Sequence, residues 1–459
     1  MRKAWKNSAT CPRLVDARLT RRAAMAGVAL VAMLAAVPLA QAQDGGVLKW
    51  MEIYSISSDQ SAQLNNDWVG KVIDQFEAEN PGWTVEQESS TWDQVDQRSI
   101  LDFNAGVPHD VMFSSPQLMA KHNATGDFFD MAPLMAAWPA AERADLDWSA
   151  GWKAGQFGDA VLSVPLGVHV RGNVYNRDLF AAAGLDPDKP FTTLDELVAG
   201  SEKLLAHDSK VWPLSLFMGN SRATIETTYA PLVWQFGGDF YDPATGKATV
   251  AGPASVKAVE WLYDAVHTWK ITPPYAYASD ADYGNLAYDI FTRGEAAQTV
   301  GFGSYWVAGL ETLGMVKDCF PASAACAVQS ANIMIQPGGK GEQFANSWNL
   351  SINSLSQHPD MAFKLIEVAL RPENLATFPD AGLPARLSAW DKPEYSSTFW
   401  QTWLEAAKKG RSMPATPYYP ELADAMAAAI QEALAGDRGN ITALLAQVEA
   451  DWNGKYAGK

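Results

Sequence analysis

The chain has 459 residues but only three cysteines and one long uncharged apolar run. That run, residues 23–39, follows seven Lys and Arg residues and precedes Ala-Gln-Ala at 40–42, a small-x-small cleavage site. We therefore expect an export signal over residues 1–42, cleaved near Ala42, and a mature protein that does not span the membrane. The pair Arg21-Arg22 indicates twin-arginine export, with general secretion and a retained membrane anchor as alternatives.

After cleavage the chain keeps two cysteines, Cys319 and Cys326, with six residues between them. An exported protein meets an oxidising environment, and a short loop that contains Pro321 closes easily. The sequence therefore predicts a disulfide between these two residues, with two unpaired buried thiols as the alternative. The spacing does not suit zinc, whose paired ligands usually have two to four residues between them. We expect no metal site.

Basic residues are few: 35 Lys and Arg stand against 52 Asp and Glu, for a formal net charge of -17. The first 42 residues hold seven of the basic residues and one of the acidic ones, so the cleaved chain is more acidic still. A strongly acidic chain repels nucleic acid and anionic lipid. Neither is expected as a partner.

Catalytic signatures are also missing. The six histidines are scattered, and the chain contains no H-E-x-x-H, no G-x-S-x-G and no Walker A loop. Nothing in the sequence indicates a cofactor, and none is expected. A secreted glycosidase stays an alternative, because a fold can bring two carboxylates together from distant segments.

Strand and helix signals alternate along the chain, which is long enough for more than one domain. An apolar run at 47–54 is followed by a helical pattern that Asn80-Pro81-Gly82 ends. Strand signals at 84–89 and 109–115 enclose a second helical segment that ends at Gly106. This order predicts an α/β protein with open, mostly parallel sheets covered by helices. Further amphipathic helices are expected at 194–207, where Thr193 is the N-cap, and at 253–269, 360–370, 420–436 and 440–456.

Two segments hold candidate binding residues. In residues 164–180, alternation places His169, Arg171 and Asn173 on one face of a strand, either to hydrogen-bond a polyol or to face solvent at a sheet edge. In "GFGSYWVAG" (301–309), Tyr305 and Trp306 stand among glycines and small residues. These rings either belong to a core strand or form a surface on which a ligand stacks.

Five segments, in this order and spacing, resemble one family: "FEAENPGWTVE", "FNAGVPHDVMF", "VYNRDLFAAAGLDPDKPFTTLDEL", "FTRGEAAQTVGFGSYW" and "AGLPAR". They are similar to the carbohydrate-type (family 1) extracellular solute-binding proteins of bacterial ABC importers, the group that includes maltose-binding protein. The resemblance covers residues 43–459. It implies a two-lobed, type II-like periplasmic-binding-protein fold, with the ligand cleft at the hinge. The N-terminal lobe would hold residues 43–168 and 348–390, and the C-terminal lobe residues 169–347 and 391–459.

The resemblance also implies a function. The protein would be a periplasmic monomer without enzymatic activity that captures a monosaccharide, oligosaccharide or polyol and delivers it to ABC permease subunits. Ligand contacts would lie on loops at the strand ends that face the cleft. The implied contacts are Asp59, Gln60, Trp92, Asp93, Ser115 and Gln117 in the first lobe, His169, Arg171, Trp348 and Asn349 at the crossings, and Asn220, Arg222, Glu226, Gly303, Tyr305 and Trp306 in the second.

Two points refine this expectation. Where maltose-binding protein carries a Trp after its "MP" segment, this chain has "MPATPYYPELADAM", so we expect a specificity unlike that for maltose. We expect Trp306, rather than Tyr305, to be the stacking ring. An alternative ligand is an anionic sugar derivative (a sugar acid, phosphate or sulfonate), on which His169, Arg171, Arg222 and Arg386 would converge, because guanidinium groups match anions.

Overall fold

A computed structural model of the chain describes residues 45–55, 60–315, 328–331, 341–396 and 398–459. The predicted signal peptide, Asp59 and the predicted pair Cys319–Cys326 lie outside the described residues. Within the described ranges, no helix has both the length and the apolar character that crossing a membrane requires.

The first sheet has the strand order β2-β1-β3-β13-β6. Its strands are β1 (Gly46–Glu52), β2 (Trp83–Ser89), β3 (Val111–Ser114), β6 (Val164–Pro165) and β13 (Asn349–Ile352). The strand β1 pairs in parallel with β2 and β3, as expected, whereas β13 returns antiparallel to β3 and β6. Because β1, β2 and β3 run the same way, the loops that follow them leave from one edge of the sheet.

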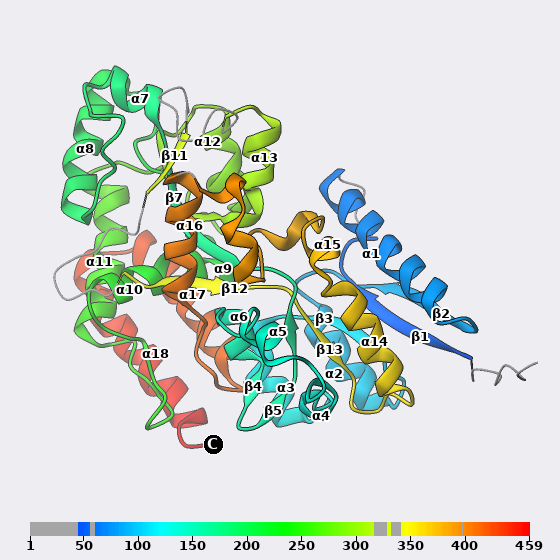
Figure 1. The fold of residues 1–459 in the computed structure, drawn as a ribbon. Coiled ribbons are helices and arrows are strands. Elements are labelled where there is room, and N and C mark those ends of the chain that lie inside the picture. Colours follow the sequence, from blue (N-terminus) through cyan, green and yellow to red (C-terminus); the bar gives the residue numbers. More distant parts are fainter. Residues whose placement is uncertain (1–44, 56–59, 316–327, 332–340, 397) are drawn as a thin grey trace, which may run out of the picture. The chain divides into compact units, whose positions relative to one another are not determined.

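Helices cover this sheet and bury an aromatic core. The helices are α1 (Gln60–Glu79), α2 (Val95–Ala105), α3 (Met119–Thr125), α4 (Ala132–Met135), α5 (Ala140–Ala144), α6 (Ala150–Ala154), α14 (Pro359–Ala369) and α15 (Pro372–Leu375), beside a small hairpin of β4 (Gln156–Phe157) and β5 (Ala160–Val161). Figure 1 shows α1 and α14 side by side, although 279 residues lie between Glu79, where α1 ends, and Pro359, where α14 begins. Gly106 ends α2 in the left-handed conformation at φ 70°, as the sequence predicts.

The second sheet has the order β10-β7-β12-β14, with β11 also paired to β7. Its strands are β7 (His169–Asn176), β10 (Gln298–Gly303), β11 (Val328–Ala331), β12 (Gln343–Asn346) and β14 (Gly410–Arg411). The strands β10, β11 and β12 all run antiparallel to β7, so this sheet is less parallel than expected. Parallel pairing occurs between β12 and β14, and between the start of β10 and residues 212–215.

The central strand β7 corrects one reading of the sequence. Every residue of β7 except Asn176 is buried, and neighbours pair with it on both sides. The alternative of a solvent-facing edge is therefore wrong, and the polar side chains of His169, Arg171 and Asn173 lie in the interior.

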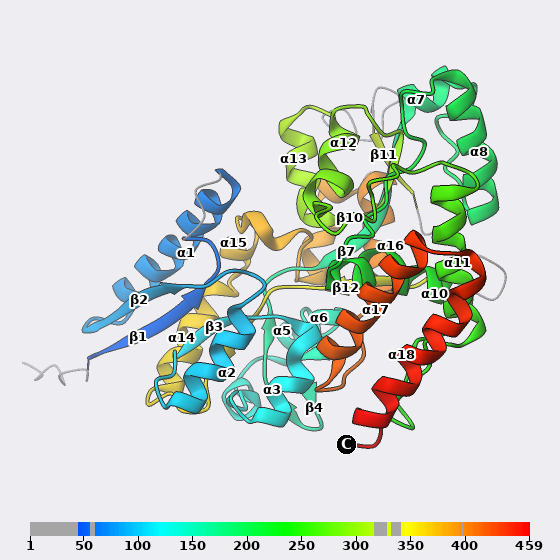
Figure 2. The ribbon, with the colours of Figure 1, turned by 180° about the vertical axis from the view of Figure 1, so that it is seen from behind.

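Helices of very different length pack around the second sheet. The helices are α7 (Arg177–Ala182), α8 (Leu194–His207), α9 (Arg222–Thr224), α10 (Ala230–Gln235), α11 (Pro253–His267), α12 (Ile290–Thr292), α13 (Val307–Thr312), α16 (Thr398–Lys408), α17 (Tyr419–Ala435) and α18 (Ile441–Tyr456), with a small hairpin of β8 (Tyr241–Asp242) and β9 (Lys247–Ala248). In Figure 2, α17 and α18 are the two red helices that lie together. The Thr193 hydroxyl accepts the backbone N–H of Glu196 at 3.1 Å, which confirms Thr193 as the N-cap of α8.

The chain changes sheets at two places that the sequence singles out. It leaves the first sheet after β6, which ends at Pro165, and enters the second at His169. It returns between the end of β12 at Asn346 and the start of β13 at Asn349. The division of the rest of the chain into lobes stays a prediction.

Candidate functional site

The loop after β1 begins with a buried carboxylate. Glu52 is fully buried and accepts hydrogen bonds from the backbone N–H groups of Tyr54 and Ser55. The hydroxyl groups of Ser55 and Ser89 donate to the same carboxylate. Since Ser89 ends β2, Glu52 ties together the ends of two neighbouring strands and fixes the path of the chain past Tyr54.

Tyr54 leads to a contact between the two sheets. Its hydroxyl donates to Oδ2 of Asp380 at 2.8 Å, and Trp348 lies close enough to the same carboxyl group to act on its pKa. From the second sheet, Nε2 of His169 donates to the backbone oxygen of Asp380 at 2.5 Å. Burial raises the pKa of Asp380 and lowers that of His169, so the imidazole is neutral at neutral pH and carries its proton on Nε2.

Tyr305 extends this contact into the second sheet. It lies on a 3-10 turn, Ser304–Trp306, that directly follows the end of β10. Tyr305 is therefore not part of a core strand. The Tyr305 ring centroid is 5.1 Å from that of His169 and 5.1 Å from the guanidinium carbon of Arg171. The Tyr305 hydroxyl donates to the hydroxyl of Tyr283 at 3.3 Å.

We call these residues the inter-sheet cluster: Tyr54, His169, Arg171, Tyr283, Tyr305 and Asp380. The cluster combines hydroxyl, imidazole, guanidinium and carboxyl groups, with the rings of Tyr283 and Tyr305 half-buried. Such a set hydrogen-bonds hydroxyl groups and packs against C–H faces. It contains three of the contacts implied by the resemblance: His169, Arg171 and Tyr305.

Glu226, Arg222 and Tyr419 lie beside the cluster. Burial raises the pKa of Glu226, and the charges of Arg222 and Arg171 offset this only in part. The Tyr419 hydroxyl donates to Oε1 of Glu226 at 3.4 Å. Glu226 lies on a π-helical turn, Ile225–Tyr229, which follows α9.

Trp306 has different surroundings from Tyr305. Its ring lies 5.2 Å from that of Tyr283, 5.5 Å from Tyr288 and 5.6 Å from Phe302, measured between centroids. Trp306 thus packs within an aromatic group of the second sheet, whereas Tyr305 contacts the polar residues of the cluster. The expectation that Trp306 is the stacking ring stays a prediction, while the ring that meets the polar residues of the cluster is that of Tyr305. Gly303 allows the Tyr305 ring to take this position, because a Cβ at residue 303 would lie only 2.4 Å from Cζ of Tyr305.

Ser115 and Gln117 lie on the loop after β3, where a buried network holds them. Asp96 accepts the backbone N–H of Ser115 at 3.0 Å and its hydroxyl at 2.5 Å. His122 joins Asp96 and Asp127 through Nε2 at 3.0 Å and Nδ1 at 2.8 Å. Burial alone would lower the pKa of His122, but the bonds to Asp127 and Asp96 outweigh it and raise the pKa to about 9. Gln117 accepts a 3.4 Å bond from Asn346 at the end of β12.

Other predicted residues lie apart from the cluster or have partners of their own. Trp92 is 62% exposed, and Asp93 and Asn220 are exposed as well. Gln60 is the first residue of α1. Asn349 is fully buried and donates to the backbone oxygen of Gly151 and the hydroxyl of Ser163.

Arg386 is also engaged elsewhere. It donates to the backbone oxygen of Leu370 at 3.0 Å and pairs with Asp145 at 3.4 Å. These bonds account for its charge, so the structure does not bring Arg386 together with His169 and Arg171.

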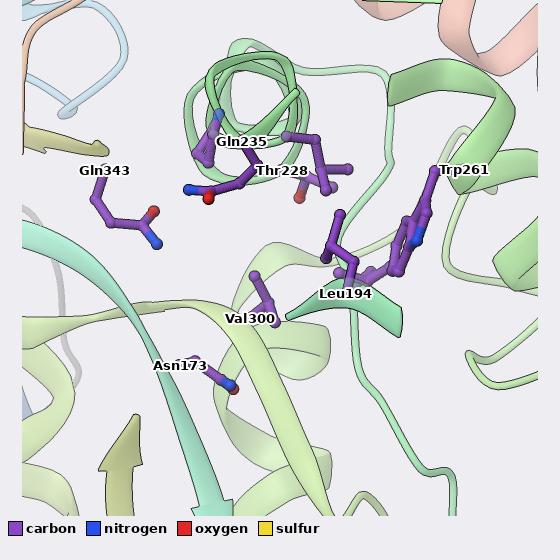
Figure 3. A pocket seen from close by; sticks show the side chains of 10 residues that line it. Asn173, Leu194, Thr228, Gln235, Trp261, Val300 and Gln343 are labelled. Atoms are coloured by element: carbon purple, nitrogen blue, oxygen red, sulfur yellow. The ribbon is translucent and has the colours of Figure 1, made fainter. Parts of the chain in front are cut away.

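Two cavities lie outside the cluster. One of about 30 Å³ lies in the second core, where Asn173, Thr228, Gln235 and Gln343 point toward it beside Leu194 and Trp261 (Figure 3). It has room for about two water molecules. A second, of about 280 Å³, is lined by Gln117, Met119, Lys153, Phe157, Arg411 and Met413 among others. Of the predicted contacts, only Gln117 borders it. In the part of the chain that the structure describes, no group of three His, Cys, Asp or Glu side chains is arranged to hold a metal ion.

Sequence reasoning missed Tyr54, Tyr283 and Asp380 as members of the site. Tyr54 directly precedes the loop from which Asp59 and Gln60 were expected to contact a ligand. Asp380 directly precedes the "AGLPAR" segment that carries part of the family resemblance. Both positions therefore had a signal, whereas Tyr283 had none.

The sequence matches the family model described as bacterial extracellular solute-binding protein over residues 61–376. The chain belongs to this family. The family assignment made from the five segments is confirmed, and so is the coarse prediction of a solute-binding protein.

Solved structures of solute-binding proteins share the fold. One from Thermotoga lettingae, bound to α-D-tagatose, superimposes with a TM-score of 0.74 at 20% identity, covering 89% of this chain and 99% of that one. One from Agrobacterium radiobacter, in complex with ribitol, gives 0.69 at 21% identity, over 89% and 98%. Maltose-bound MalE3 of T. maritima gives 0.70 at 18% identity, over 87% and 98%. The two-lobed periplasmic-binding-protein fold is thereby confirmed.

Curated relatives of this solute-binding protein match it over only about half of their length. A probable amino-acid ABC transporter periplasmic-binding protein of Sinorhizobium fredii is 25% identical over 254 residues, 52% of this chain and 51% of the relative. A putative binding protein of Brucella abortus is 26% identical over 255 residues, 53% and 56% of the two chains. The chain therefore spans about half the length of the curated relatives it matches.

Proposed function

We propose that this protein is the periplasmic component of an ABC importer, which captures a carbohydrate or polyol and delivers it to the permease subunits. The observation that carries the proposal is the inter-sheet cluster, in which donors, acceptors and an aromatic ring from both sheets meet. Closure around a ligand needs only a higher affinity for the closed state, and no bond has to be made or broken. The cluster offers Tyr54 and Asp380 from one sheet and His169 and Tyr305 from the other.

The chemistry of the cluster suits hydroxyl groups. Tyr54, His169 and Tyr283 can each donate and accept, so a ligand hydroxyl that inserts between two bonded groups, accepting from one and donating to the other, keeps both paired. A ligand that leaves one unpaired loses about 1–3 kcal/mol, which is the basis of selectivity. The tagatose, ribitol and maltose in the similar solved structures support a polyhydroxylated ligand, whereas the name of the Sinorhizobium relative points to amino acids.

The remaining features belong to the same proposal. The two sheets would be the centres of the lobes 43–168 with 348–390 and 169–347 with 391–459, joined by the two crossings between the sheets. Cleavage near Ala42 would release the mature monomer into the periplasm, where the disulfide between Cys319 and Cys326 would form. The family's extracellular character supports this location.

A thermal-shift screen of the mature protein against monosaccharides, disaccharides, polyols and their acidic derivatives tests the proposal. A ligand that binds the folded state raises the midpoint in proportion to the logarithm of its concentration. Calorimetry with the best ligand then compares Tyr305→Ala with Tyr275→Ala, which removes a 46% exposed tyrosine outside the cluster. We expect Tyr305→Ala to weaken binding about tenfold or more and Tyr275→Ala to leave it unchanged. A protein that no sugar, polyol or sugar derivative stabilises, but amino acids do, would not be a carbohydrate-binding protein.

A further inference from the structure

Arg171 is a buried cation without a counterion. The side chain leaves the central strand β7, and the residue is 6% exposed. Among the described residues, no carboxylate oxygen lies within 4.0 Å of its guanidinium nitrogens, and Nε and Nη1 have no hydrogen-bond partner. The charge of Glu226 influences Arg171, but from beyond ion-pair distance.

The other buried arginine shows what is missing. Arg177 is also 6% exposed and pairs with Asp188. The half-buried Arg386 pairs with Asp145, and Arg411 pairs with Asp239 and Glu342. Removing a charge from water is unfavourable by several kcal/mol unless a counterion and hydrogen bonds compensate. Arg171 keeps this penalty in the ligand-free chain, which marks it as a group whose partner comes from outside.

The surroundings of Arg171 leave the edge of its guanidinium group available to that partner. The guanidinium carbon lies 5.1 Å from the ring centroid of Tyr305 and 5.2 Å from that of Phe344, so rings cover the group. Tyr283 lies close enough to the guanidinium group to help raise its pKa. The N–H groups lie in the guanidinium plane, where a carboxylate or phosphate binds through two parallel hydrogen bonds. Tyr305 is only half-buried, so a change in its side-chain orientation gives access from the cluster.

The carboxyl groups nearest Arg171 make no ion pair with it among the described residues. Burial raises the pKa values of Glu226 and Asp380, and nearby positive groups, Arg171 among them, offset this in part. The charge of Arg222 also acts on Glu226, and Arg222 makes no ion pair with a described residue. His169 is held neutral by burial and takes no part in the charge balance at neutral pH.

We infer that the ligand carries a negatively charged oxygen group, a carboxylate or a phosphate on a polyhydroxylated skeleton, and that Arg171 binds that group. This inference rests on the proposed function, because the hydroxyl-binding cluster supplies the rest of the site. Arg171 thereby decides between an acidic ligand and its neutral counterpart.

Matched pairs of compounds test the inference. Calorimetry with the mature protein compares glucose with glucuronate and glucose 6-phosphate, galactose with galacturonate, and maltitol with maltobionate. We expect the acidic member of at least one pair to bind about 30-fold more tightly or better than its neutral counterpart. The uronate and phosphate arms show which oxygen group the site prefers.

Variants of Arg171 show whether this residue is responsible. We expect Arg171→Met to lower the affinity for the acid about 100-fold, to change that for the neutral sugar less than fivefold, and Arg171→Lys to restore part of the loss. The control Arg438→Gln removes the same charge from a side chain that is 44% exposed and pairs with Glu260. This change should alter neither affinity. The melting midpoint of each ligand-free variant shows that it has folded.

The outcomes separate the two proposals. If neutral sugars bind as tightly as their acids, or if Arg171→Met weakens both equally, the inference is wrong and carbohydrate capture stands. If no compound of any pair and no other sugar or polyol binds, the proposed function itself is wrong.

Discussion

Two buried cations, one beside each sheet, have opposite surroundings. His122 near the first sheet is fully buried between Asp96 and Asp127, and a serine hydroxyl donates to each of the two carboxylates. Arg171 in the second sheet has aromatic rings and one hydroxyl but no counterion. A charge with all its partners in the chain makes a rigid structural element. A charge that lacks one is ready to bind a ligand.

The first network also explains how the loop after β3 is positioned. Asp96 lies on α2 and holds both the backbone and the side chain of Ser115, while His122 from α3 fixes Asp96. His122 thus acts on the loop only through Asp96. The rigid loop then offers Gln117 to Asn346 at the end of β12.

The largest effect should come from removing His122. We expect His122→Ala to lower the free energy of unfolding by about 3–5 kcal/mol, because it leaves two buried carboxylates without their shared cation. Urea titration of the ligand-free protein measures this. The control His207→Ala changes an exposed histidine at the end of α8 and should cost less than about 0.5 kcal/mol. Equal losses of unfolding free energy in the two variants would mean that the network of Asp96, His122 and Asp127 does not stabilise the folded chain.

The pH dependence of stability gives a second, smaller test. The pKa of His122 is raised to about 9 in the folded chain, so folding favours the protonated imidazole. Its contribution is complete below the unfolded pKa near 6.5 and is lost as the pH rises through 9; over that range it amounts to about 3 kcal/mol. We expect the unfolding free energy to fall between pH 7 and pH 10, and His122→Gln to flatten this decline. A wild-type curve as flat as that of the variant would contradict the raised pKa.

The sequence predicts local structure where one short signal decides it. Thr193 caps α8 and Gly106 ends α2, because the cap geometry depends on the side chain or conformational freedom of a single residue. The order of strands and helices likewise predicts the parallel part of the first sheet. The second sheet is mostly antiparallel because β10, β11 and β12 all run back along β7, and no local pattern in the sequence indicates this.

The site was harder to predict than the fold. Alternation in β7 predicts that His169 and Arg171 share a face, but it does not tell whether that face meets solvent or an aromatic ring. The partners that decide this, Tyr305 and Asp380, are more than 130 residues away in the sequence. The network of Asp96, His122 and Asp127 was also hard to predict, because its members come from separate segments. A pairing between distant residues is a property of the tertiary structure, so sequence patterns suggest the candidates but not the contacts.

The smallest effect on stability should come from Arg171. In the ligand-free protein Arg171→Met removes a buried charge that lacks a counterion, and its loss of favourable ring contacts is about 0.5–2 kcal/mol. The desolvation penalty that disappears at the same time is of similar or larger size, so the unfolding free energy should change by less than about 1 kcal/mol or rise. Arg386→Met is the matched control, because it leaves Asp145 half-buried and unpaired and should cost about 2–3 kcal/mol. Urea titration without ligand measures both. A loss for Arg171→Met as large as for Arg386→Met would show that the guanidinium already stabilises the folded chain, and Arg171 would then resemble His122 in being a structural cation.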